Sequence, residues 1–147
     1  MALDIELLRE NFNLVLEKSP NLTTRLYEIL FERYPQVKPL FARRSPAAHE
    51  RMVTQALIAV VNNLEDTKWL HDTLFALGAR HVNYGLTDEM YGWAGSALLL
   101  ALAEASGDAW TPRVEDAWVQ AYDIIVQMML EGAHSVSRLS NEMRLSA

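Results

Sequence analysis

Apolar residues recur every three or four positions along almost the whole chain, and no stretch alternates apolar and polar residues as a half-buried strand would. The pairs Ser19-Pro20, Ser45-Pro46 and Thr111-Pro112 each place a capping hydroxyl before a proline, which is typical of a helix start. Gly85 and Gly107 each follow an apolar stripe and are typical of helix ends. The pattern therefore predicts an all-α fold of six or seven helices.

Two histidines lie on the apolar stripes of two consecutive predicted helices. His49 shares a face with Val53, and His81 shares a face with Leu77. An apolar helix face normally excludes a polar ring, so two inward imidazoles suggest a pocket that holds a metal or a cofactor. The chain has no cysteine and no carboxylate cluster beside these histidines, so a haem iron held by imidazole is the favoured interpretation. A hydrogen-bonded core histidine is the alternative for each of them.

Length and charge exclude several classes of protein. The 147 residues fit one domain, and a net charge of -6 without a basic stripe argues against a nucleic-acid partner. The longest apolar run, residues 97–103, is far shorter than a membrane span. Asp4, Glu6 and Glu10 interrupt any signal peptide at the amino terminus. We therefore expect a cytoplasmic protein without membrane association and with, at most, a non-covalent cofactor.

The carboxyl-terminal residues differ in character from the rest of the chain. The last predicted helix is expected to end or loosen at Gly132, and the chain turns polar and rich in serine from His134 onward. We therefore expect a folded domain over residues 1–133 and a polar extension over residues 134–147. Apolar residues keep a weak helical spacing in the extension, so an ordered partner-binding helix is the alternative to a frayed terminus.

Four segments, in their order and spacing, resemble the globin family. Residues 26–41 (LYEILFERYPQVKPLF) are similar to the second and third helices of the family, and residues 49–66 (HERMVTQALIAVVNNLED) to the distal helix. Residues 77–85 (LGARHVNYG) resemble the proximal histidine segment, and residues 117–129 (AWVQAYDIIVQMM) resemble the last helix. The similarity is to bacterial single-domain globins, the globin domains of flavohaemoglobins, and neuroglobin. It implies a globin fold in the first 133 residues, with six or seven helices around a pocket for haem b.

The resemblance also assigns roles to individual residues. His81 corresponds to the proximal iron ligand and His49 to the distal histidine, and coordination of the iron by His49 is left open. We expect the other ring nitrogen of His81 to donate a hydrogen bond to a backbone carbonyl one turn back, near Leu77. The remaining matches are Phe41 against the haem, Val53 above the iron, Tyr27 beside the bound gas, Tyr91 on the proximal side and Arg80 near a haem propionate.

Some positions depart from the family pattern or fall outside it. Flavohaemoglobins carry a glutamate on the last helix that supports the proximal histidine, and Ala133 stands at that position here. Glu131 lies two residues earlier and is expected to point to another side of the helix. Met52 stands where a basic residue often meets a propionate. His71 and His134 are expected to be solvated surface residues.

The function that the resemblance implies is reversible binding of O2, and of CO and NO, at ferrous haem iron, as in oxygen binding or transport. Nitric-oxide dioxygenase activity, which detoxifies NO as nitrate, is a further expectation and needs an external reductase. One alternative is an input module of a gas or redox sensor. Another is a haem-free interaction domain of globin-like fold, against which the presence of both His49 and His81 argues.

Overall fold

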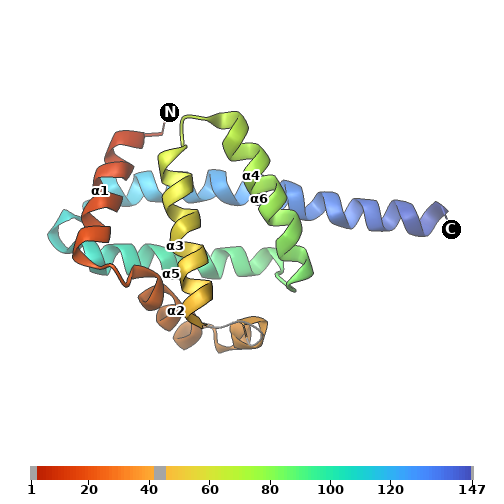
Figure 1. Cartoon of the computed structure of the whole chain (residues 1–147), viewed down its shortest axis with the longest axis horizontal. Coiled ribbons are helices and arrows are strands. Elements are labelled where there is room, and N and C mark those ends of the chain that lie inside the picture. Colours follow the sequence, from red (N-terminus) through yellow and green to blue (C-terminus); the bar gives the residue numbers. More distant parts are fainter. Residues whose placement is uncertain (1–2, 42–45, 147) are drawn as a thin grey trace.

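The computed structural model describes residues 3–41 and 46–146, and within them the chain is helical and contains no strand. This confirms the predicted all-α class. Figure 1 shows the helices packed across one another in one body, from which the end of the last helix projects. The elements in chain order are α1 (Ile5–Lys18), α2 (Leu22–Arg33), the 3-10 helix η1 (Pro35–Phe41), α3 (Pro46–Asn62), α4 (Thr67–Asn83), α5 (Asp88–Ser106), the 3-10 helix η2 (Gly107–Ala109) and α6 (Pro112–Ser146).

Local sequence explains most helix boundaries. Thr111 accepts a hydrogen bond from the amide of Val114 at the start of α6, as the threonine–proline pair predicts. Gly85 and Gly107 both have a positive φ after a helix end, as predicted. The predicted cap at Ser19 is wrong, because α2 begins only at Leu22 and Ser19 instead follows the last residue of α1. The other predicted cap, Ser45, lies outside the described residues.

The core lies where α1, α4 and α5 turn their apolar faces inward. Leu8, Leu74 and Leu102, one from each of these helices, are at most 1% exposed. Burial of a leucine side chain stabilises the fold by roughly 1.5–3 kcal/mol relative to leaving it in water. The packed core therefore fixes the helices that carry the candidate site.

The helices α4 and α6 touch through their backbones at two glycines. A Cβ atom built on Gly78 of α4 would lie 1.9 Å from the carbonyl oxygen of Met129 of α6. A Cβ atom built on Gly132 of α6 would lie 1.9 Å from the carbonyl oxygen of Phe75 of α4. No side chain fits at either position, so each glycine is needed for this close crossing.

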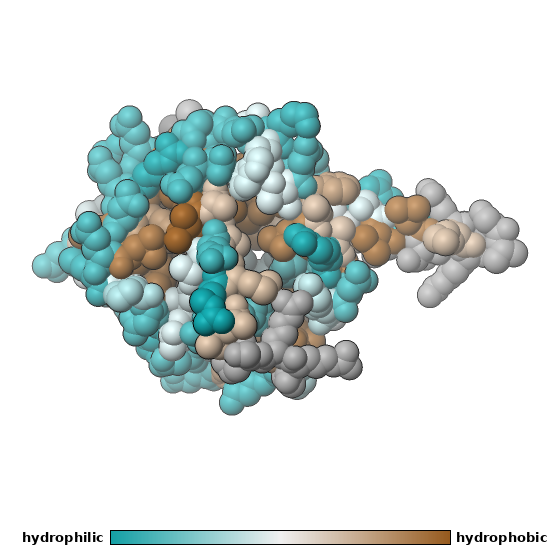
Figure 2. All heavy atoms as spheres, viewed as in Figure 1, coloured by the Kyte–Doolittle hydropathy of each residue, from teal (hydrophilic) through white to brown (hydrophobic). Residues whose placement is uncertain are grey.

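The predicted end of the last helix at Gly132 is wrong. The helix α6 continues through Gly132 to Ser146, because this glycine serves the contact with α4 and not a left-handed helix end. Figure 1 shows the last turns of α6 projecting from the body. Hydrophobic side chains are visible on this segment in Figure 2. Leu139 of this segment is 58% exposed, and Met143 is 70% exposed. The division into a domain of residues 1–133 and an extension of residues 134–147 stays a prediction.

Candidate functional site

Aromatic side chains from α2, η1 and α3 meet in one cluster. The ring centroid of Tyr27 lies 5.4 Å from that of Phe41 and 5.4 Å from that of His49, and Phe41 and His49 are 4.9 Å apart. Phe31, one turn after Tyr27 on α2, packs against both Tyr27 and Phe41. We call these four residues the Tyr27 cluster. Three of its members were predicted from the sequence, and Phe31 was not.

His81 lies in the last turn of α4 and is held in one orientation. Its Nδ1–H donates a hydrogen bond to the carbonyl oxygen of Leu77 at 2.7 Å, which confirms the predicted acceptor. A proton on Nδ1 leaves the lone pair of the neutral ring on Nε2. Burial lowers the pKa of His81, and the neighbouring charges of Arg80 and His49 lower it further against the opposing effect of Leu77. The imidazole is therefore neutral at pH 7, which is the form that binds metals.

The two histidines of the site come from consecutive helices, α3 and α4, and are close enough for the charge of His49 to act on His81. Within residues 3–41 and 46–146, no group of three or more His, Cys, Asp or Glu side chains could hold a bare metal ion. A pair of imidazoles beside aromatic walls does fit a flat group that brings its own equatorial metal ligands. Haem is such a group, and His81 and His49 are the residues that would hold its iron.

The other predicted site residues lie on α3, α4 and α5. Val53 is half-buried one turn after His49 and packs against the core. Arg80 is exposed beside His81. Tyr91 is 5% exposed, and its hydroxyl is buried without a hydrogen-bond partner in the described part of the chain. Burial, together with the charge of Asp88, raises the pKa of Tyr91, so this phenol stays protonated.

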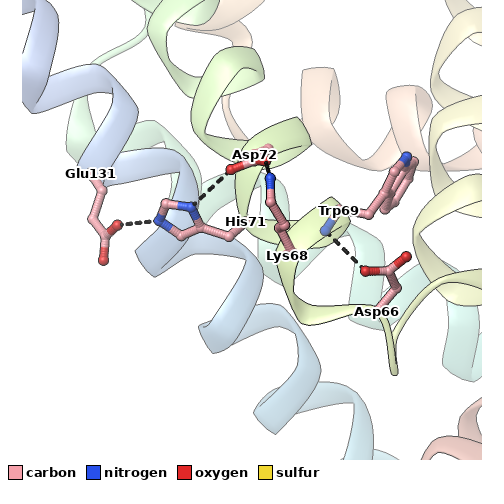
Figure 3. A network of polar contacts seen from close by, with 6 residues as sticks. All are labelled: Asp66, Lys68, Trp69, His71, Asp72 and Glu131. Atoms are coloured by element: carbon pink, nitrogen blue, oxygen red, sulfur yellow. Dashed lines mark hydrogen bonds and ion pairs between the residues drawn. The ribbon is translucent and has the colours of Figure 1, made fainter.

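The last helix, α6, carries no carboxylate at position 133, where the sequence departs from the flavohaemoglobin pattern. Ala133 is 5% exposed, so a small apolar side chain occupies this buried place. Glu131 instead accepts a hydrogen bond from Nε2 of His71 at 2.8 Å, at the surface between α4 and α6 (Figure 3). Nδ1 of the same imidazole faces Asp72 at 3.7 Å. The prediction that Glu131 points to another side of the helix fits this geometry.

Sequence reasoning missed that the two other histidines hold partners. His71 and His134 are both about half exposed, as predicted for surface residues. Yet His71 binds Glu131, and Nε2 of His134 lies 2.9 Å from a carboxylate oxygen of Asp88 at the start of α5. Each pair joins α6 to another helix. Its two residues lie far apart in the sequence, so no local pattern could reveal the contact.

Comparison with known proteins agrees with this geometry. The globin family profile matches residues 24–129. The flavohemoprotein of Rhodopirellula baltica is 29% identical over 133 residues, which are 88% of this chain and 33% of that protein. The flavohemoprotein of Bacillus subtilis is 24% identical over 128 residues, which are 86% of this chain and 32% of that protein. The chain thus spans about one third of the length of these relatives.

Solved structures share the fold. A bacterial globin from Campylobacter jejuni superposes with a TM-score of 0.78 at 22% identity, over 91% of this chain and 96% of that one. An engineered carbene transferase, a proposed nitric oxide dioxygenase from Rhodothermus marinus, gives 0.77 at 23% identity, over 95% of both chains. The family profile covers most of the chain, and the helices and paired histidines agree with it. The chain belongs to the globin family.

Proposed function

We propose that this protein binds haem b through Nε2 of His81 and reversibly binds O2, CO and NO beside the Tyr27 cluster. The observation that carries the proposal is the bond from His81 to Leu77, which leaves a neutral imidazole with its lone pair on Nε2. His81 would hold the haem iron, and the iron would supply the reversible binding of a diatomic gas. Every other property of the site comes from the side chains around it.

Tyr27 is the proposed hydrogen-bond donor to the gas. Burial raises the pKa of Tyr27, and the charge of Glu50 raises it further, so the phenol keeps its proton at any physiological pH. A protonated phenol donates to a polar ligand such as O2 and slows its release, whereas the less polar CO gains little. His49 supplies a second polar group at the same cluster, either as a donor to the gas or as a ligand of the iron.

Apolar residues limit the space around the cofactor. Phe41 ends η1 and packs edge-on against Tyr27, so its ring forms a wall of the cluster. Val53 shares the face of α3 with His49 and restricts the room for larger ligands. Arg80 is exposed beside His81 and is suited to pair with a carboxylate at the edge of the cofactor. We assign Tyr91 to the proximal side of the cofactor.

Nitric-oxide dioxygenase activity is the reaction that we propose for this site. The support is the similarity to flavohemoproteins and to a proposed nitric oxide dioxygenase. In this reaction NO and O2 combine with one electron to give nitrate, so the protein needs an external reductase. The expected result is consumption of NO in the presence of O2, NADH and a flavin reductase, with nitrate as the product.

An absorption spectrum tests the proposed function directly. The purified protein, reconstituted with haem, is measured in the ferric state, in the ferrous state and under CO. We expect a strong Soret band that shifts on reduction and again on addition of CO. A protein that takes up no haem at equimolar concentration contradicts the proposal.

A further inference from the structure

A polar groove lies between α2 and α3, the two helices that carry Tyr27 and His49. Its volume is about 400 Å³. The first residues of α2 and the first half of α3 form its walls. Its lining residues are Pro20, Asn21, Thr23, Thr24, Ala47, Glu50, Arg51, Thr54 and Gln55.

Each wall of the groove is connected to the cluster through the helix that carries it. Thr24 lies one turn before Tyr27 on α2, so the two residues share a face. Glu50 directly follows His49 on α3. The same two helices therefore supply residues both to the groove and to the Tyr27 cluster.

Two side-chain hydrogen bonds close this crossing. The hydroxyl of Thr24 donates to Oε2 of Glu50 at 2.9 Å. Deeper in the crossing, the hydroxyls of Thr23 and Thr54 lie 2.6 Å apart, and Thr23 is only 4% exposed. The inner pair is fixed further because Thr54 donates to the carbonyl oxygen of Glu50 at 2.8 Å. The bond from Thr24 to Glu50 is half-buried, and the groove is lined by both of these residues as well as by Thr23 and Thr54.

The carboxylate of Glu50 also acts on the cluster beyond it. Its charge contributes to the raised pKa of the Tyr27 phenol, after the larger effect of burial. The carboxylate of Glu50 and the phenol of Tyr27 are therefore close enough to interact.

We propose that the groove is an entry route for small ligands to the Tyr27 cluster, and that the hydrogen bond from Thr24 to Glu50 is its gate. This inference rests on the proposed function, because the ligands are the diatomic gases and water that reach the haem pocket. When the bond opens, the first turns of α3 separate from α2 and the groove extends to Tyr27 and His49. Glu50 is a positioning residue in this proposal, since it acts through the spacing of the two helices.

The test measures CO association after flash photolysis of the haem-loaded protein. Thr24→Val keeps the side-chain volume and removes the donor, and we expect it to raise the association rate constant by about fivefold, as for loss of one hydrogen bond. Ala47→Trp fills the groove and should lower the rate constant severalfold. Glu50→Gln keeps an acceptor oxygen and should stay within about twofold of the parent. Thr67→Val, an exposed threonine at the start of α4, is the matched control and should change nothing.

Amide hydrogen exchange of the haem-free protein separates this inference from the proposed function. Thr24→Val should speed exchange over residues 46–55 of α3, whether or not the protein takes up haem. Unchanged exchange over residues 46–55 in Thr24→Val overturns the proposed gate. The gate is also overturned if Thr24→Val and Ala47→Trp both leave the CO association rate constant unchanged. If the protein binds no haem at all, the proposed function fails, and the exchange measurement alone supports or overturns the gate.

Discussion

Glu131 of α6 accepts a hydrogen bond from the imidazole of His71 of α4 at 2.8 Å, although 59 residues separate them along the chain. The bond lies at the surface, and Glu131 directly precedes Gly132 of the glycine crossing, whereas His71 lies seven residues before Gly78. It joins the helix that carries His81 to the helix that projects from the body. Because the imidazole of His71 titrates, this contact makes the free energy of unfolding depend on pH.

The His71 pair should make the protein more stable in mild acid than in mild base. Glu131, followed by Asp72, raises the pKa of His71 above its ordinary value of 6.5. A raised pKa gives stability that is fully present below the unfolded pKa and is lost as pH rises through the folded pKa. Urea unfolding at pH 5.5 and 8.5 should show that His71→Gln is destabilised relative to the parent only at the lower pH. In a Glu131→Gln background this pH dependence should disappear, and its persistence would assign the effect to other groups.

Haem retention should depend on His81. We expect His81→Ala to fold as a helical protein that loses most of its haem, with partial recovery on addition of imidazole. Gel filtration of the reconstituted protein, followed by the ratio of Soret to protein absorbance, measures the retained haem. His134→Ala is the control, because that histidine binds Asp88 at the surface and should keep full haem content. Equal haem content in both variants would remove His81 from the ligand role.

Tyr27 should control the departure of O2. Tyr27→Phe keeps the ring in its packing against Phe41 and removes only the hydroxyl. We expect the O2 dissociation rate to rise roughly ten- to a hundredfold, the range for losing a charge-assisted hydrogen bond. The CO dissociation rate should change much less. Equal effects on both gases in stopped-flow displacement would show that the mutation altered access and not hydrogen bonding.

The glycine crossing should tolerate no side chain. Gly132→Ala places a methyl group 1.9 Å from the backbone oxygen of Phe75, so α4 and α6 must separate. We expect a loss of about 2 kcal/mol or more in the free energy of unfolding, measured by urea denaturation. Gly92→Ala in α5 is the matched control, because nothing lies within 4 Å of its Cβ, and it should gain about 0.5–1 kcal/mol. An unchanged free energy of unfolding in Gly132→Ala would show that α4 and α6 cross less closely than described above.

Tyr122, which is half-buried, and Tyr91, which is buried, should respond differently to loss of their hydroxyls in the haem-free protein. The hydroxyl of Tyr122 donates to the carbonyl oxygen of Tyr91 at 2.6 Å, so Tyr122→Phe should cost about 1 kcal/mol. The hydroxyl of Tyr91 is buried without a partner among the described residues, so Tyr91→Phe should be neutral or stabilising by up to about 1 kcal/mol. Thermal unfolding of both variants measures the difference. A large loss in Tyr91→Phe would reveal a hydrogen bond to that hydroxyl.

Local chemistry explains what the sequence predicts well. The period of apolar residues predicts the all-α class, and the bond from His81 to Leu77 follows from helix geometry because both residues lie on one helix. The cluster of Tyr27, Phe41 and His49 agrees with residues that the family resemblance singled out. The roles of these residues stay predictions.

The features that the sequence could not predict depend on contacts between residues that lie far apart in the chain. Gly132 looks like a helix end in sequence, yet its missing side chain serves a contact with Phe75 on another helix. The bond from Thr24 to Glu50 joins residues of ordinary surface type, and no spacing within one helix marks it. Thr24 one turn before Tyr27, together with the carboxylate of Glu50 next to His49, is the signal that could have been noticed.

The glycine crossing brings the backbone of α6 into contact with that of α4, the helix that carries His81. Because the two backbones touch at Gly78 and Gly132, we expect a tilt of α4 to turn α6 with it, with this crossing as the pivot. The arm of α6 from Gly132 to Ser146 is about 20 Å long at 1.5 Å per residue. A tilt of roughly 5° at the pivot therefore displaces the tip by roughly 2 Å, a length set by this helix geometry. The projecting end thus magnifies displacements of α4 that would be hard to detect within the body of the protein.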